Sequence, residues 1–380
     1  ATGTAGGGGY GAAYNTSNST GNRNEANITT GLLPNYLAVS GKTRQNDLDV
    51  AFTISINPGA STKQAGKQDS QQENRQAFLT FGDASWGSIK LGKDLGIFAS
   101  DAILNDMTLL GVGSGAGGLA GNTTTTGRIG TGFMYADWKA QVAYTTPNFN
   151  GFSATAGVTQ AWNVNNTIAG ATSVQRGGGE PAFEAKASYD FAADAVKAKL
   201  WASVFTQQVN GLTAGNAVAE SGSTAAVAAT RLTGAAANDR ADAWDVGANV
   251  NAAGFGLTAY YYEGNGIGQT VQLNGGFDAA GNDRNSDGYY VQATYALPGV
   301  GTKLGVSYGE SQLKGSSAEA TLNKITDDMW TVGVYHPLTK HLNLVAEYSE
   351  AQHKYDVKTA NVATTSSEGK TIALGAILFF

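Results

Sequence analysis

Three side chains that carry oxygen ligands stand at alternating positions in one short run of the sequence. Asp283, Asn285 and Asp287 precede Gly288, and this order matches the first half of a calcium-binding loop. Thr294 occupies the twelfth position, where such a loop carries a glutamate. The run therefore predicts Ca²⁺ held weakly by these three residues, with backbone carbonyls and water completing the coordination. The alternative is a polar outer loop in which Asp and Asn side chains form turns.

The residue types that most often catalyse reactions are scarce. The chain has 3 His and no Cys in 380 residues. His336 and His341 lie five positions apart, so on a strand they point to opposite faces and cannot share a metal. Neither order nor spacing indicates a set of Ser, His and Asp. We therefore expect no enzymatic activity, and no cofactor other than a weakly bound Ca²⁺.

The composition narrows the class of protein further. Charged residues make up 14% of the chain, against about 25% in a typical soluble domain. The net charge is −6, which argues against nucleic acid as a partner. The sequence contains no run of about 20 apolar residues, the length that a membrane-spanning helix needs. Its polarity comes mainly from Gly, Asn, Thr, Ser and Gln.

The dominant hydrophobic period is two residues, which indicates β-strands. Between Leu342 and Ser349, and again between Trp138 and Thr145, apolar side chains alternate with small or polar ones. About sixteen such segments can be placed along the chain. They lie near residues 10–14, 36–41, 47–56, 76–82, 87–93, 131–145, 151–161, 182–190, 196–207, 242–251, 254–263, 287–296, 302–311, 328–336, 341–350 and 371–380.

The connections between these segments alternate between short turns and long polar loops. The short ones include 41–46, 82–86, 146–150 and 252–253, and the long ones include 58–75, 94–130, 208–241, 264–286 and 351–369. This alternation predicts an all-β fold, a transmembrane antiparallel β-barrel with short periplasmic turns and long external loops. The alternative is a soluble sandwich or propeller, which buries its apolar face in a core and needs no such alternation.

Four segments together resemble the general porins of Gram-negative bacteria, above all their β-proteobacterial branch. The segments are 75–93, which enters the third loop, the turn at 144–152, the last turn and strand at 335–348, and the terminal strand 372–380 with its final Phe. The resemblance covers about residue 36 to the end of the chain. It implies one porin domain over residues 1–380, with sixteen strands and a third loop, about 94–130, folded into the lumen.

The resemblance also implies a function and a place in the cell. Such a protein is a passive channel for small hydrophilic solutes and ions, assembled as a homotrimer. It resides in the cell outer membrane after removal of a signal peptide, among membrane lipids and lipopolysaccharide. Three rival functions stay open: a substrate-specific channel for sugars or organic acids, a non-conducting adhesin or structural barrel, and an outer-membrane enzyme, for which no convergent His or acid pair is visible.

In porins the third loop presents carboxylates to basic residues of the pore wall, and the resemblance carries these roles to this chain. Asp106, which precedes Met107, matches a constriction acid, and Asp101 is a weaker match. The basic wall positions fall on Arg75, Lys90, Lys93, Arg128 and Lys139. Two departures lower the charge of the constriction. Leu110 and the residues after it replace a second loop acid, and Tyr36 stands where a wall arginine is common. The alternative is that these charged side chains are simply solvated at the ends of the barrel and take no part in a constriction.

Strand parity, together with the charges expected on the folded third loop and at its anchors, predicts which charges line the lumen, because side chains alternate between the two faces of a strand. The expected basic residues are Arg75, Lys90, Lys93, Arg128, Lys139, Lys186, Lys197, Lys199 and Lys303. The expected acidic residues are less numerous: Asp49, Asp101, Asp106, Glu184, Asp245 and Glu347. The sequence therefore predicts a weak preference for anions, despite the negative net charge.

Overall fold

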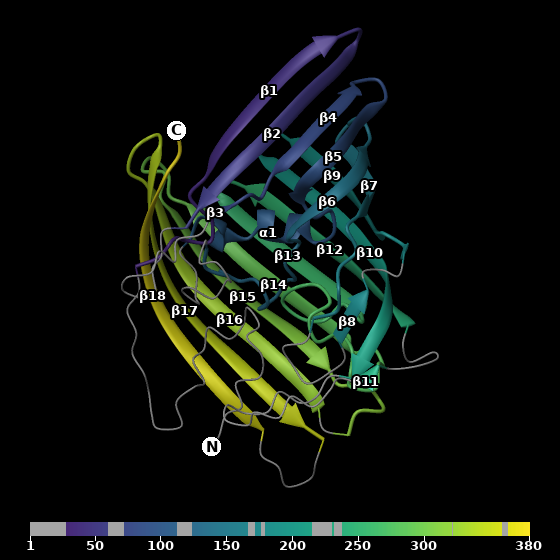
Figure 1. The fold of residues 1–380 in the computed structure, drawn as a ribbon. Helices are drawn as coiled ribbons and strands as arrows, with labels where there is room; N and C mark the ends of the chain where they lie inside the picture. Colours follow the sequence, from purple (N-terminus) through teal and green to yellow (C-terminus); the bar gives the residue numbers. More distant parts are fainter. Residues whose placement is uncertain are drawn as a thin grey trace, which may run out of the picture.

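The structure is a computed structural model that describes residues 28–59, 72–111, 124–165, 172–175, 179–214, 230–231, 238–320, 322–358 and 364–380. Strands dominate these residues (Figure 1). They are β1 (Leu37–Gln45), β2 (Leu48–Pro58), β3 (Gln72–Glu73), β4 (Ala77–Asp83), β5 (Gly87–Leu95), β6 (Trp138–Thr145), β7 (Phe152–Thr159), β8 (Thr172–Gln175), β9 (Ala182–Ala193), β10 (Val196–Ala214), β11 (Thr230–Arg231), β12 (Asn238–Ala252), β13 (Phe255–Asn265), β14 (Asn285–Ala296), β15 (Lys303–Lys314), β16 (Leu322–Pro337), β17 (Leu342–Val357) and β18 (Thr365–Leu378). The expected all-β fold of about sixteen antiparallel strands is confirmed.

Each long strand pairs with its neighbour in the sequence, always antiparallel, from β1 to β18. The short strands β3, β8 and β11 add pairs at the ends of β2 and β10. One rim of the sheet carries only short connections, such as the turn at Asn46 and Asp47, where both residues have positive φ. The opposite rim carries the long loops, so the expected alternation of connections is confirmed.

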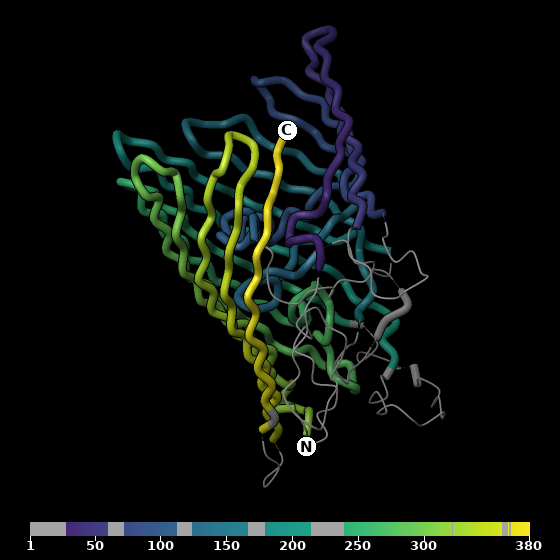
Figure 2. The backbone as a smooth tube through the Cα atoms, turned by 90° about the vertical axis from the view of Figure 1, so that its left-hand side faces the viewer, coloured from purple at the N-terminus to yellow at the C-terminus, as the bar shows by residue number. Residues whose placement is uncertain are grey.

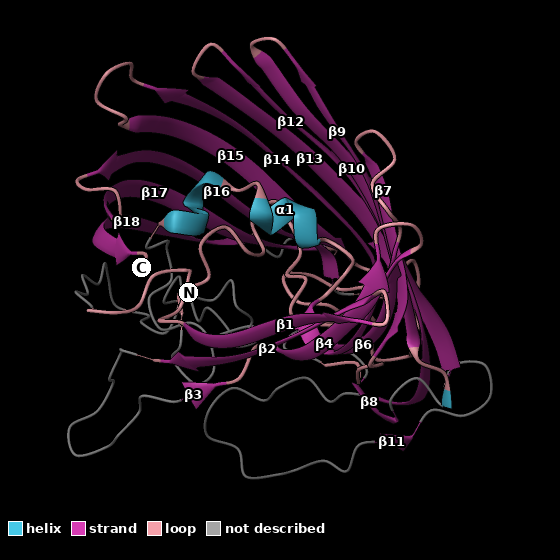
Figure 3. Ribbon diagram, turned by 90° about the horizontal axis from the view of Figure 1, so that it is seen from above, coloured by secondary structure: helices cyan, strands magenta, loops and turns pink. Residues whose placement is uncertain are grey.

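The sheet bends into a ring of strands around an interior (Figure 3). Within the described residues, β1 pairs only with β2, and β18 pairs only with β17, so these strands do not close the ring. In Figure 2 the two edges appear as the purple and yellow ends of the wall. The strand expected at residues 10–14 lies outside the described residues.

The two faces of the wall differ as the period of two requires. The outer face exposes large apolar side chains, among them Leu200, Val204 and Leu257. Aromatic pairs flank this apolar surface, with ring centroids 5.3 Å apart for Trp330 and Tyr348. At the opposite rim the rings of Phe255 and Tyr295 stand 4.4 Å apart. An apolar belt between aromatic girdles suits a wall that faces lipid.

The inner loop, whose described residues are 96–111 and 124–137, leaves the wall after β5 and returns to it at β6. It contains the helix α1 (Ser100–Leu104) and the 3-10 helix η1 (Met107–Leu110). Figure 3 shows α1 inside the ring of strands. Among the described residues, no helix is long and apolar enough to cross a membrane. The strand expected at 131–145 begins only at Trp138, because Phe133 and Met134 are fully buried in the inner loop and not in a strand.

Candidate functional site

The inner loop is held inside the ring by an apolar contact with one side of the wall. Phe98, Phe133 and Met134 of the loop are fully buried, in one cluster with Phe205 of β10 and Tyr290 of β14. The rings of Phe98 and Phe205 lie 5.9 Å apart, and those of Phe133 and Tyr290 lie 5.7 Å apart. The loop therefore fills the lumen beside the strands from β9 to β14, and the third-loop position predicted from the sequence is the one that the fold uses.

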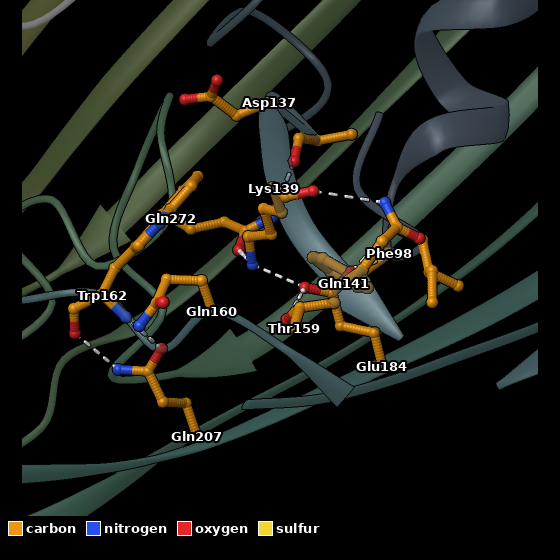
Figure 4. A network of polar contacts seen from close by, with 12 residues as sticks. Phe98, Asp137, Lys139, Gln141, Thr159, Gln160, Trp162, Glu184, Gln207 and Gln272 are labelled. Atoms are coloured by element: carbon orange, nitrogen blue, oxygen red, sulfur yellow. Dashed lines mark hydrogen bonds and ion pairs between the residues drawn. The ribbon is translucent and has the colours of Figure 1, made fainter. Parts of the chain in front are cut away.

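Glu184 of β9 anchors the start of the inner loop. One carboxylate oxygen, Oε2, accepts hydrogen bonds from the backbone N–H groups of Ile97 and Phe98, both at 2.8 Å. The other oxygen, Oε1, accepts from Thr159 Oγ1 at 2.9 Å and pairs with Lys139 Nζ at 2.5 Å (Figure 4). The Glu184 side chain is fully buried. A buried carboxylate with this many donors fixes the backbone that it binds.

Lys139 of β6 lies beneath the loop and not in open water. Its side chain is 1% exposed. Besides Glu184, its ammonium group donates to Gln272 Oε1 at 2.6 Å. It also lies 4.5 Å from the ring centroid of Trp162 and 4.9 Å from that of Phe205. Parity places Lys139 on the inner face as predicted, but this lysine joins two loops to the wall and does not itself contact the water of a channel.

Asp101, in the first turn of α1, pairs with two lysines of the wall. Its carboxylate lies 3.0 Å from Lys186 Nζ on β9 and 2.6 Å from Lys199 Nζ on β10. The carboxylate is 3% exposed, whereas the lysines keep 27% and 30% of their side-chain surface. Burial opposes ionisation of Asp101, yet the two ammonium groups outweigh it and hold the pKa of this carboxyl below its usual value.

Asp106 and Arg128 meet inside the inner loop. Asp106 Oδ1 lies 4.0 Å from Arg128 Nε, and both side chains are fully buried. Asp106 also accepts hydrogen bonds from the N–H and the hydroxyl of Thr108. Arg128 donates to the carbonyl of Met329 at 2.8 Å, across on β16. Burial raises the pKa of Asp106, although Arg128 and Thr108 act in the opposite direction. The pair predicted as opposed pore charges is thus brought together as a buried contact within the inner loop, so Arg128 is not a residue of the barrel wall, although it bonds to β16.

Lys90 lies on the inner face of β5, together with Asp94, whereas Arg75 stands just before β4, beside Glu73 and Trp138. Arg75 Nε donates to Glu73 Oε2 at 2.9 Å, and its guanidinium stands 5.7 Å from the ring of Trp138. Lys90 forms an ion pair with Asp94, four residues further along β5, and remains 32% exposed.

The placement of Lys93 in the lumen is corrected by the strand register. Lys93 pairs with Ala77, and two residues before it Leu91 pairs with Leu79, which is 41% exposed on the outer face. Residues two apart on a strand share a face, so Lys93 points away from the lumen. Its ammonium donates to the carbonyl of Asn74. Lys90 and Lys93 are three apart on one strand and therefore could not both face inward.

Three features of the inner face were not predicted. Lys42 and Arg44 lie on the inner face of β1, with Arg44 bound to Asp49 at 2.7 Å and to Asp83 at 2.8 Å. They were missed because the sequence pattern ended the first described strand at Gly41, while β1 continues to Gln45. The anchoring role of Glu184 was also missed, because an isolated acid on a strand carries no signal for its partner.

Two of the three side chains predicted to bind Ca²⁺ have partners within the protein. Asp287 Oδ1 lies 2.5 Å from Lys314 Nζ, and the amide of Asn285 donates to Asn265 Oδ1 at 3.2 Å. Asp283 forms an isolated bridge with Phe277. In the described part of the chain, no three His, Cys, Asp or Glu side chains gather where they could hold a metal. The calcium interpretation stays a prediction.

Comparisons with known proteins agree with this geometry. A family model described as Gram-negative porin matches residues 2–356. The solved outer membrane channel DcaP of Acinetobacter baumannii superposes with a TM-score of 0.59 at 14% identity, over 90% of this chain and 84% of that chain. The anion-selective porin from Comamonas acidovorans gives 0.54 at 16% identity, over 92% and 91%. OmpF of Salmonella typhi gives 0.55 at 15% identity, over 95% and 93%. A comparison with curated protein sequences gave no match.

Proposed function

The chain belongs to the Gram-negative porin family and forms an outer-membrane diffusion channel, and we propose that this channel prefers anions among the small hydrophilic solutes and ions that cross it. The observation that carries the proposal is the unequal exposure of the two signs of charge around the inner loop. Asp101, Asp106 and Glu184 have side chains that are at most 3% exposed.

Three lysines around the same loop keep contact with water, whereas Lys139 does not. Lys90, Lys186 and Lys199 retain between 27% and 32% of their side-chain surface. One carboxylate, that of Asp101, serves two of these ammonium groups, so the trio carries one net positive charge. An ion in the lumen therefore meets lysine charge more directly than carboxylate charge, and a charged constriction filters ions by sign.

The test is the reversal potential of single channels in a planar bilayer across a KCl gradient. We expect wild type to prefer chloride, and Lys186→Gln and Lys199→Gln each to shift the preference toward potassium. Lys93→Gln is the matched control, because the same change on the outer face should leave the reversal potential unchanged. A cation-selective wild type, or a control that shifts as far as the lumen variants, would overturn the proposal.

The homotrimer is part of the proposal, supported by the side of the barrel that holds β1, β2 and β4. β4 has 7 residues, whereas β17 has 16, so this side spans a shorter distance across the membrane. Its outer face exposes Val39, Ile54 and Leu79. A short apolar wall suits a neighbouring subunit better than lipid. If the purified protein in mild detergent had only the mass of one monomer, this assembly would be contradicted.

Contact with lipopolysaccharide is also proposed, at the rim of long loops. Beyond the girdle of Trp330 and Tyr348, the outer face carries Lys354 with Asp328 and Lys370 with Glu350. Charged side chains at this depth face the headgroup region of the outer leaflet. Lys354→Ala with Lys370→Ala should reduce the lipopolysaccharide that copurifies with the barrel, and unchanged copurification would contradict the contact.

A further inference from the structure

A second loop also folds into the lumen. The second inner loop, residues 266–284, connects β13 and β14 on the same rim as the inner loop. Ile267, Leu273 and Phe277 are fully buried and belong to the same apolar cluster as Phe98 and Phe133 of the inner loop. A long external loop in water exposes most of its side chains, so this burial marks a structural element of the interior.

The second inner loop bonds directly to the first. The N–H of Tyr135 donates to the carbonyl of Thr270 at 2.9 Å, and Tyr135 and Val271 form a parallel bridge. Gln272 accepts from Lys139 Nζ at 2.6 Å, so one buried ammonium group joins this loop to Glu184, the anchor of the inner loop (Figure 4). The two loops and the wall thus share one hydrogen-bonded network.

The backbone of this loop is forced into its shape. Thr270 and Leu273 have φ of 71° and 65° and are both buried. Residues with a Cβ seldom adopt positive φ, least of all a β-branched one, and such strain persists only where the surroundings impose it. Gly130 of the inner loop has no room for a side chain, because a Cβ there would lie 2.5 Å from Thr270 Oγ1. The contact between the two loops is therefore close and specific.

The far end of the loop is tied to the rim. Arg284, fully buried, binds Glu319 through Nε at 2.9 Å and through a second nitrogen at 2.5 Å. It also donates to the carbonyl of Gly275 at 2.9 Å. A bidentate pair of this kind fixes orientation as well as distance. Gln269 donates to the carbonyl of Ser311 on the wall at 3.1 Å. The loop is held at both ends and in the middle.

From this we infer that the second inner loop is a second constriction element, which sets the size limit of the channel together with the inner loop. The inference rests on the proposed function as a conducting pore. The two loops fill the lumen beside β9 to β14, so water and solutes must pass along the remaining wall. The passage is narrower than the inner loop alone would make it, and the solutes that it excludes are the larger neutral sugars.

The loop can be shortened without moving its stems. A Cβ built on Gly268 would lie 2.6 Å from the backbone nitrogen of Asn274, so these two residues are already adjacent. Deleting residues 269–273 joins them and removes Gln272 and Leu273. We expect the single-channel conductance to rise by about 1.5-fold or more, because a wider aqueous pore conducts better. In liposome swelling, a neutral trisaccharide that wild type retards should enter faster, while a pentose should be unaffected.

A point variant keeps the test valid if the deletion fails to fold. Gln272→Lys places a second cation against Lys139 in a buried site, which repels the loop from its seat. Gln312→Lys, the same change on the outer face of β15, is the matched control. We expect higher conductance and faster trisaccharide entry for Gln272→Lys alone. Each protein must first show the heat-dependent gel shift of a folded barrel.

The outcomes separate the two proposals. If wild type conducts no ions, the proposed function fails. If wild type conducts, and both the deletion and Gln272→Lys fold but keep the wild-type conductance and sugar limit, the inner loop alone sets the constriction and this inference is wrong. If Gln312→Lys raises the conductance as much as Gln272→Lys does, the effect comes from added charge and not from release of the loop, and the inference is again wrong.

Discussion

Asp101→Asn isolates the charge balance of the constriction from its shape. The amide has almost the size of the carboxylate, but it no longer neutralises Lys186 and Lys199, which lie 3.0 and 2.6 Å from it. The net charge of the trio rises from one to two positive charges. Both lysines are already about 30% exposed and can rehydrate, so the loss of stability should stay below about 1 kcal/mol. The change in selectivity should therefore be measurable in a folded channel.

The size of that change follows from Coulomb's law. A unit charge acts on an ion about 7 Å away with about 0.6 kcal/mol at the dielectric constant of water. Screening at about 0.1 M salt roughly halves this energy. The chloride gains about 0.3 kcal/mol and the potassium loses as much, so their permeability ratio should rise about threefold. A pore wall of lower dielectric constant strengthens the interaction, which makes this figure a lower estimate.

Reversal potentials at two salt concentrations test this reasoning. At about 0.1 M KCl, Asp101→Asn should be more anion-selective than wild type, whereas at about 1 M, where the screening length is about 3 Å, most of the difference should vanish. Asp328→Asn is the control, because Asp328 lies on the outer face of β16 beside Lys354. If Asp101→Asn keeps the wild-type ratio at low salt, permeating ions do not approach this trio, and the placement of the constriction is wrong.

Three further predictions concern anchoring, pH and assembly. Arg128→Met leaves the Asp106 carboxylate buried without its guanidinium partner. The free energy of unfolding measured in urea should therefore fall by about 3–5 kcal/mol, and an unchanged unfolding midpoint would refute the buried contact. Burial opposes ionisation of Asp101, yet its lysine partners hold the pKa of this carboxyl below its usual value, so its anchoring contribution is present at neutral pH and lost only as pH falls through that lowered pKa. A change of selectivity on titrating Asp101 with a midpoint above the usual pKa of an aspartate would contradict this. Deleting Phe380, which is fully exposed beyond β18, should lower the yield of folded protein in cells without changing the stability of the purified barrel, and normal membrane levels would count against an assembly role.

The strands were predictable wherever the wall has one apolar and one polar face. The expected strand at 254–263 is β13 within two residues, and 196–207 is the part of β10 next to the short turns. The length of the strands was underestimated at the ends that lead into the long loops. β10 continues to Ala214 and β16 begins at Leu322. Beyond the lipid both faces of a hairpin meet water or loops, so the alternation that identifies a strand disappears while the backbone pairing continues.

The constriction was predictable in position but not in detail. The pattern placed a long loop after β5, and the family resemblance placed Asp101 and Asp106 on it. It could not show that Arg128 is fully buried or that Lys139 lies under the loop, because burial depends on which distant strand a loop packs against. The second inner loop left a weak sequence signal. Ile267, Leu273 and Phe277 are large apolar residues in a mostly polar loop, and all three are buried.

A count of charges cannot predict selectivity when the lumen contains a folded loop. Water competes for every backbone group of such a loop, so the loop must be held to the wall by strong interactions from which water is excluded. Glu184 provides one by accepting two backbone N–H groups and an ammonium group, and Arg128 provides another through Asp106 and β16. A charge used in this way is neutralised and withdrawn from the water that ions cross. In this chain the acids around the loop are almost completely buried in anchoring contacts, whereas some of the lysines remain exposed to water. The sign of the pore is then set by the charges that the fold does not need for its own stability.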